Sequence, residues 1–377
     1  MKRILLLITL LTAWSTITYA QKYTVELQLG FWADSVQQPE IKPIITLYKN
    51  YLESHPDSLY DNPYWNEAEK QKYRDFDFTR NSIFQEGGWS AKSLYNSFTP
   101  HLLKVEKRDS VYLIQAMLYS AKADVAWQKF NPILIHRYYA VKEGEDWKLA
   151  NAITYDTEDW KTISTKYIDF HFSRSKYYSD TLAALSNSFC DTIIKRFNFT
   201  PPTQKVAYYV ADGVHEVGRL LGYDHYIYGF AYGKTIENII ISGNGTVYYP
   251  HELVHQFSNN HPERGGIIEE GFATWLGGSM GKSYDELARQ YASEYRSNRG
   301  ASFEWAWQCP INCYPFAAII FDLLHEYTGD KGVAAFLKLP SRNVEETYSA
   351  IRKVTGWNKK EFLRKWATKM MLLSSNT

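Results

Sequence analysis

The sequence is poor in cysteine, in long apolar runs and in excess charge of either sign. Only three of its 377 residues are Cys, and the formal net charge is +1. A chain without a strong positive balance lacks the electrostatic footprint of a protein that binds nucleic acid or anionic membranes. Beyond the N-terminal segment, no apolar stretch approaches the roughly 20 residues that a membrane-spanning helix needs. We therefore expect no nucleic-acid partner and no stable membrane insertion.

The few cysteines favour a structural role. Cys309 and Cys313 lie four positions apart, and an oxidising compartment would allow them to pair, which leaves Cys190 single. The alternative, a metal site built from these thiols, lacks the second pair of ligands that such sites normally have.

The N-terminus resembles an export signal. Met1-Lys2-Arg3 is basic, Ile4 to Leu11 is largely apolar, and Thr18 and Ala20 are small residues placed as at a cleavage site. We expect residues 1–20 to be a cleaved signal peptide and the protein to be periplasmic or secreted. The polar stretch at residues 156–159 then divides the remainder into two predicted domains, 21–155 and 156–377.

The first predicted domain changes pattern along its length. Residues 21–75 favour helices, at Pro39 to Leu52 and Pro63 to Tyr73. Apolar alternation then predicts a strand over residues 111–119 and a hairpin formed by 133–141 and 147–153. Helices followed by an antiparallel meander resemble the NTF2-like cone fold. That resemblance implies a ligand pocket or a docking or dimerisation module, and docking is the expectation because no catalytic set of residues stands out.

The second predicted domain begins with mixed elements and ends helical. The pattern predicts strands at 166–172, 205–210 and 236–241, and helices at 180–197 and 214–221. After Gly265-Gly266 the chain is expected to be helical almost to its end, including an apolar segment at 314–327. The fold class expected for the whole chain is therefore α+β.

The stretch His251-Glu252-Leu253-Val254-His255 carries the clearest chemistry. Positions i and i+4 share one face of a helix, so His251 and His255 can hold one metal ion. Glu252 lies about 100° around the helix, where it can address a water on that metal instead of the metal itself. Pro250 suits a helix start, and apolar residues at 253, 254 and 257 would anchor the helix. This is the pattern of two zinc ligands and a general base.

Two other motifs match known patterns only in part. Gly229 to Thr235 has three residues between its glycines where a phosphate-binding loop has four, and it leads into a predicted strand rather than a helix. Gly277 to Gly281 matches the Gly-x-Ser-x-Gly nucleophile elbow around Ser279. However, the elbow follows a buried strand, and residues 267–276 are expected to be helical. A serine hydrolase using Ser279 stays open as a minor alternative.

A catalytic zinc site normally has three protein ligands, and the sequence offers two candidates for the third. His261 lies six residues after His255, the metzincin spacing, but Ser258 stands where that motif has Gly. Glu270 lies fifteen residues after His255, and on a second helix its carboxylate could return to the His pair. Its neighbour Glu269 is expected to be a solvated charge.

HELVH followed by Glu269-Glu270-Gly271-Phe272-Ala273-Thr274-Trp275 resembles the gluzincins, the clan of thermolysin-like and aminopeptidase-like zinc peptidases. The resemblance covers roughly residues 165–340. It implies that Zn²⁺ binds His251, His255 and Glu270 and that Glu252 is the general base. It also implies an oxyanion donor at Tyr314, with His325 as its competitor. The Gly-x-Met-x-Asn motif of the aminopeptidases is absent.

The sequence thus predicts an exported zinc metallopeptidase that acts on a peptide or protein substrate. The alternative from another class is a catalytically silent, peptidase-like protein whose metal site is structural and whose N-terminal domain does the docking. Glu252 separates the two, because a structural metal site has no use for a carboxylate that binds no metal.

Overall fold

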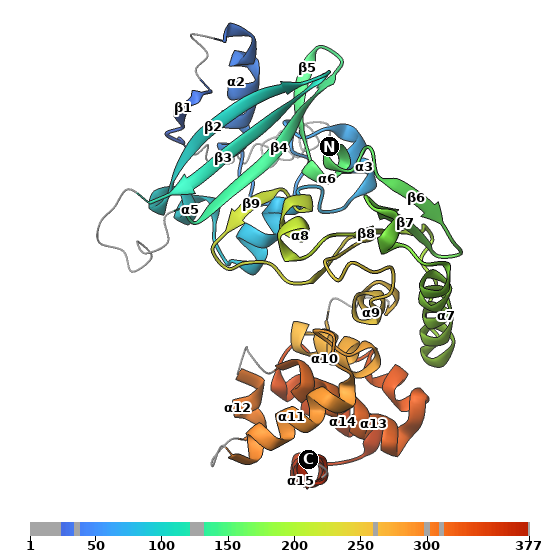
Figure 1. Ribbon diagram of the computed structural model, residues 1–377. Coiled ribbons are helices and arrows are strands. Elements are labelled where there is room, and N and C mark those ends of the chain that lie inside the picture. Colours follow the sequence, from blue (N-terminus) through green and yellow to red (C-terminus); the bar gives the residue numbers. More distant parts are fainter. Residues whose placement is uncertain are drawn as a thin grey trace, which may run out of the picture. The chain divides into compact units, whose positions relative to one another are not determined.

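The structure is a computed structural model that describes residues 24–33, 38–120, 132–258, 263–297, 302–308 and 313–375. It combines two mixed sheets with many helices, and the predicted α+β class is confirmed (Figure 1). The chain forms two compact units. One holds the described residues up to Glu158 together with Gly218–Phe230, and the other holds Asp159–Val217 and the described residues from Ala231 onward.

The first unit is organised around a six-stranded sheet of order β1-β2-β3-β4-β5, with β9 also paired to β4. β2 to β5 form an antiparallel meander, of which the alternation predicts β3, β4 and β5 but not β2, and β3 begins and ends where expected. The strands are β1 Gln28–Trp32, β2 Thr99–Arg108, β3 Val111–Tyr119, β4 Leu134–Glu143, β5 Asp146–Ala150 and β9 Tyr223–Tyr226.

Two predictions for the start of this unit are wrong in detail. β1 lies in a region expected to be mostly helical, because its backbone pairs with β2 and tertiary pairing overrides weak local propensity. The second predicted helix does not open at Pro63. It begins at Glu67, where the Asn66 side chain accepts a hydrogen bond from Glu69 N and caps it.

The helices of this unit are short apart from α2. They are α2 Lys42–Leu52, preceded by a 3-10 turn at Pro39–Ile41, α3 Glu67–Lys72, α4 Phe78–Arg80, continued by a π turn at Asn81–Glu86, α5 Ala91–Ser97 and α6 Ala152–Asp156. Buried aromatic side chains of α2 and α4, among them Tyr48, Tyr51 and Phe78, join Tyr138 of β4 in the core, as does Trp65, which lies just before α3.

Arg137 of β4 ties the segment 218–230 into the first unit. Its guanidinium pairs with Asp156 at 2.7 Å and Asp224 at 3.0 Å, and it donates to the carbonyl of Arg219 at 2.9 Å. Asp156, expected in a polar break, is therefore mostly shielded from solvent and paired, with its side chain 9 % exposed. A charge as deeply buried as that of Arg137 is stable only while it has its partners.

The second unit has a five-stranded sheet of order β10-β11-β8-β7-β6. β8 is parallel to both β7 and β11, whereas β6 and β10 are antiparallel edge strands. The strands are β6 Lys161–Ser164, β7 Ile168–Phe172, β8 Val206–Val210, β10 Gly233–Ile236 and β11 Ile239–Ser242.

The single strand predicted over residues 236–241 is wrong. The chain turns at Glu237, whose φ is +50°, and the run divides into the β10–β11 hairpin. Neither Glu237 nor Asn238 is Gly or Pro, so the β-branched residues around them mask the turn. As a result, residues 239–241 of the predicted strand belong to the buried strand β11, whereas Ile236 is the last residue of the edge strand β10.

The remainder of this unit is helical, as predicted for the region after Gly266. The helices are α7 Asp180–Phe197, α8 Val214–Leu220 at the junction of the two units, α9 Pro250–Phe257, α10 Gly266–Gly277, α11 Tyr284–Ser297, α12 Phe303–Gln308, α13 Cys313–Phe336, kinked at Gly329, α14 Val344–Thr355 and α15 Lys359–Ser375. No helix within the described ranges is long and apolar enough to cross a membrane.

Replacing Arg137 by Met tests the buried ion pairs of the first unit. The variant should lower the free energy of unfolding by about 3 kcal/mol, because it leaves the buried carboxylate of Asp156 without its cation. Lys166→Met, which removes an exposed pair with Asp191, should leave the free energy of unfolding nearly unchanged. Urea denaturation measures the free energy of unfolding of both variants. Equal losses in the two would contradict a stabilising role for the Arg137 ion pairs.

Candidate metal centre

Helix α9 presents the HELVH residues because its opposite face is fixed in the core. Pro250 occupies its first turn, and Leu253, Val254 and Phe257 are buried. The helix extends as predicted from the sequence. His251 and His255 consequently lie one turn apart on a single face, with their ring centroids 5.0 Å apart.

Helix α10 brings Glu270 to this His pair through close packing. A Cβ atom at Gly271 would lie 2.4 Å from Cβ of Ala317 in α13, and one at Gly277 would lie 2.5 Å from the backbone nitrogen of His251. Neither glycine has a positive φ, so the backbone conformation does not require glycine at these positions. The short contacts do, because any side chain would collide with the neighbouring helix. Glycine thus lets α10 approach both α13 and α9.

Three ligand atoms converge between the two helices. His251 Nε2 lies 3.1 Å from Glu270 Oε2 and 3.3 Å from His255 Nε2, and His255 Nε2 lies 3.6 Å from Glu270 Oε1. Ligand atoms of a tetrahedral zinc site, each about 2.0–2.1 Å from the ion, are about 3.3 Å from one another. Among the described residues this is the only such group of His, Cys, Asp and Glu side chains. The residues therefore fit a zinc ion in donor type and spacing.

The tautomer of His251 also suits a ligand. Its Nδ1 lies 2.7 Å from the carbonyl oxygen of Gly278, directly after α10, so the ring donates its Nδ1 proton there. Nε2 is then the ring nitrogen that would bind a metal ion together with Glu270 and His255. A carbonyl that accepts the distal ring proton is a common support for metal-binding histidines.

The cluster stabilises opposite charges on its members. Burial disfavours a charged His255, but the hydrogen bond and negative charge of Glu270 outweigh it and raise the pKa of His255 to about 9. Burial also opposes ionisation of Glu270, yet hydrogen bonds from His251 and His255 lower its pKa to about 2. Glu270 is therefore ionised, as a ligand must be, and a metal ion would compete with a proton for His255.

Glu252 lies beside the cluster without belonging to it. Its Oε2 accepts a hydrogen bond of 2.7 Å from the hydroxyl of Thr235 in β10. A Cβ atom at Gly233, two residues earlier in the same strand, would lie 2.2 Å from Oε1. Neither Thr235 nor Gly233 could be placed beside Glu252 from the sequence, because their proximity depends on how the hairpin packs on α9.

The neighbouring Glu269 corrects one expectation. It is not a solvated charge: its side chain is 15 % exposed, and its Oε1 pairs at 2.6 Å with Nε of Arg264, which is itself buried. Burial raises the pKa of Glu269, with Arg264 acting in the opposite direction. Glu269 therefore holds the connection between α9 and α10 and is not a member of the ligand group.

The remaining candidates lie in different surroundings. The ring centroid of Tyr314, at the start of α13, is 6.2 Å from that of His251. His325 pairs instead with Asp330 at 3.3 Å and lies against Trp275. Ser279 follows the C-terminus of α10, not a strand, so the context of a nucleophile elbow is missing. His261 and Cys309 lie outside the described residues, as does the side chain of Cys313, whereas Cys190 is buried and free.

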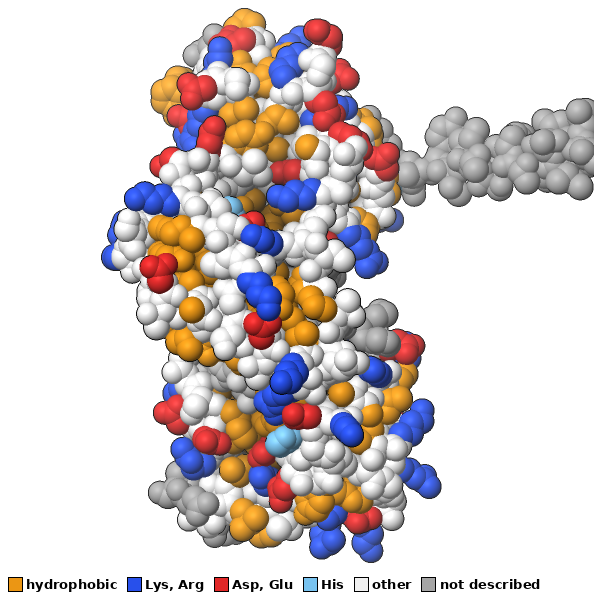
Figure 2. Space-filling view, turned by 90° about the vertical axis from the view of Figure 1, so that its right-hand side faces the viewer, with side chains coloured by type: hydrophobic (Ala, Val, Ile, Leu, Met, Phe, Trp, Pro, Cys, Tyr) orange, Lys and Arg blue, Asp and Glu red, His pale blue; other side chains and the backbone are white. Residues whose placement is uncertain are grey.

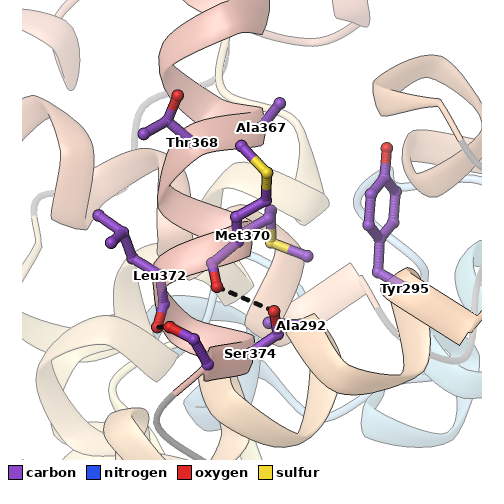
Figure 3. Close-up of a pocket in the computed structure, with 9 residues that line it drawn as sticks. Ala292, Tyr295, Ala367, Thr368, Met370, Leu372 and Ser374 are labelled. Carbon is purple, nitrogen blue, oxygen red and sulfur yellow. Dashed lines mark hydrogen bonds between the residues drawn. The ribbon is translucent and has the colours of Figure 1, made fainter.

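Two surface features lie apart from the cluster. A cavity of about 550 Å³ between α11 and α15 is lined mainly by apolar groups, including Tyr295 and Met370 (Figure 3), and by none of the ligand residues. Among the described residues visible in Figure 2, Lys and Arg are interspersed with Asp and Glu. Neither the apolar cavity nor the mixed surface charge indicates a particular reaction or ligand, so we take the cluster of His251, His255 and Glu270 as the candidate site.

Comparison with known proteins adds no assignment. No protein-family model matches the chain, and no curated protein matches its sequence.

Zinc content tests the ligand set directly. The purified protein should carry about one zinc per chain, and Glu270→Ala should lose most of it because two imidazoles alone bind weakly. Elemental analysis of the folded variants provides the measurement.

Glu269→Ala is the matched control. It should keep its zinc but lower the free energy of unfolding by about 3 kcal/mol, because it removes the carboxylate that pairs with the buried guanidinium of Arg264. If His261→Ala loses the metal while Glu270→Ala keeps it, the third ligand is His261 and our assignment is wrong.

Proposed function

We propose that the protein is an exported zinc metallopeptidase of gluzincin type that hydrolyses peptide bonds. The observation that carries the proposal is the convergence of His251, His255 and Glu270, with the separate carboxylate of Glu252 directly beside them. A structural site explains the first three residues and leaves the fourth without a purpose. Export rests on the N-terminal sequence pattern.

The ligands would hold Zn²⁺, which lowers the pKa of a water molecule it binds and polarises the substrate carbonyl. Glu252 would accept the proton of the attacking water and pass it to the leaving amine. Tyr314, whose ring centroid lies 6.2 Å from that of His251, would donate a hydrogen bond to the oxyanion that forms on the carbonyl. The proposed ligands, base and oxyanion donor all come from α9, α10 and the start of α13.

Strand β10 supports a peptide as the substrate. Within the described part of the chain it is an edge strand of its sheet and pairs with β11 along one side. An extended peptide can add to such an edge as a further strand. Because β10 also contacts Glu252, a peptide bound there would lie close to the proposed general base.

Replacing Glu252 by Gln separates the enzyme from a silent binding protein. The variant keeps the shape of the side chain but removes the basic carboxylate. We expect it to fold, to retain zinc and to lose peptide hydrolysis by at least ~10²-fold, measured with a library of unstructured fluorogenic peptides.

The wild type should also be silenced by chelators and restored by zinc. Should fully zinc-loaded wild type cleave no peptide in a broad library, or should the Gln variant be equally active, the silent docking alternative would replace our proposal.

A further inference from the structure

The carboxylate of Glu252 is held by a strand that is remote from it in sequence. Thr235 lies 17 positions earlier, yet its hydroxyl is 2.7 Å from Glu252 Oε2. The Glu252 side chain is buried, and it has several rotatable bonds that a general base must keep in one arrangement. A hydrogen bond to an ionised carboxylate is among the stronger ones in proteins, so this contact is able to select that arrangement.

Gly233 provides space for this carboxylate. Residues 233 and 235 lie two positions apart in β10 and therefore face the same side of the sheet. A side chain at position 233 would meet both Glu252 Oε1, at 2.2 Å, and the ring of Tyr249, at 2.7 Å. The backbone of Gly233 has no positive φ, so space for the carboxylate and the ring explains the glycine.

Thr235 is itself well fixed. It pairs with Ile240 within the β10–β11 hairpin, and its β-branched side chain has few rotamers. The direction of its hydroxyl is therefore set by the strand and not by Glu252. The strand orients the carboxylate.

We propose that Thr235 is a positioning residue for Glu252 and that Gly233 provides the space that this position requires. The inference rests on the proposed function. By holding Oε2, Thr235 fixes the orientation of the carboxylate that takes the proton of the water. A peptide added to the edge of β10 would then share one rigid element with the base, which fixes the distance between the base and the scissile bond.

Kinetics of Thr235→Val test the role. Valine keeps the β-branched shape and the backbone pairing but lacks the hydroxyl. We expect kcat to fall about 10-fold, the factor that corresponds to about 1.4 kcal/mol, with KM within about twofold and zinc content unchanged. Thr235→Ser should recover most of the loss because it restores the donor. Thr162→Val, in the exposed strand β6, should leave kcat unchanged.

A stability cycle gives a readout independent of activity. Thr235→Val should lower the melting temperature in the wild-type background, where it leaves a buried carboxylate without its donor. The same change should have little effect in a Glu252→Ala background. A smaller effect of Thr235→Val in the Glu252→Ala background than in the wild type would show that the hydroxyl of Thr235 acts through Glu252.

The outcomes separate this inference from the proposed function. Wild-type kcat in Thr235→Val, or additive effects in the stability cycle, would overturn the positioning role while leaving a metallopeptidase intact. A zinc-loaded wild type that cleaves nothing would overturn the proposed function and with it the catalytic meaning of the contact, even if the stability cycle still showed coupling.

Discussion

The close contact of α10 with α9 is the constraint on which the candidate site depends. Glu270 reaches the His pair only because Gly277 lies against the backbone of His251 and Gly271 against Ala317. Glycine inside a helix costs about 1 kcal/mol relative to alanine. Gly271, in the interior of the twelve-residue helix α10, indicates that proximity outweighs helix propensity there. A local conflict of this kind is typical of functional sites.

The surroundings of the cluster follow from that contact. The carbonyl that ends α10 fixes the tautomer of His251, and the Arg264–Glu269 pair holds the connection between the two helices. The β10–β11 hairpin, through Thr235, holds the carboxylate of Glu252. The two neighbours of α9 therefore differ in chemistry. Helix α10 adds a ligand atom for a cation, whereas the hairpin orients a base that does not belong to the ligand group.

Local periodicity in the sequence was enough to predict HELVH as a helix with both imidazoles on one face. The same reasoning found the helical tail and the antiparallel meander of β3, β4 and β5. Glu270 was one of two candidates for the third ligand, and only the family resemblance favoured it over His261, since nothing local indicates which of the two returns to the pair. Thr235, Gly278 and Arg264 were not predicted, because hydrogen bonds and ion pairs between separate elements leave no periodic pattern. The β10–β11 turn was missed because Glu237 adopts a positive φ without glycine.

A crystal structure of zinc-soaked protein, with data collected at the zinc absorption edge, tests the central claim most directly. The account predicts one strong anomalous peak about 2.0–2.2 Å from Nε2 of His251, Nε2 of His255 and a carboxylate oxygen of Glu270, with Glu252 outside ligand distance. A peak that excludes Glu270, that includes Glu252 as a ligand, or that is missing from the cluster altogether would contradict it.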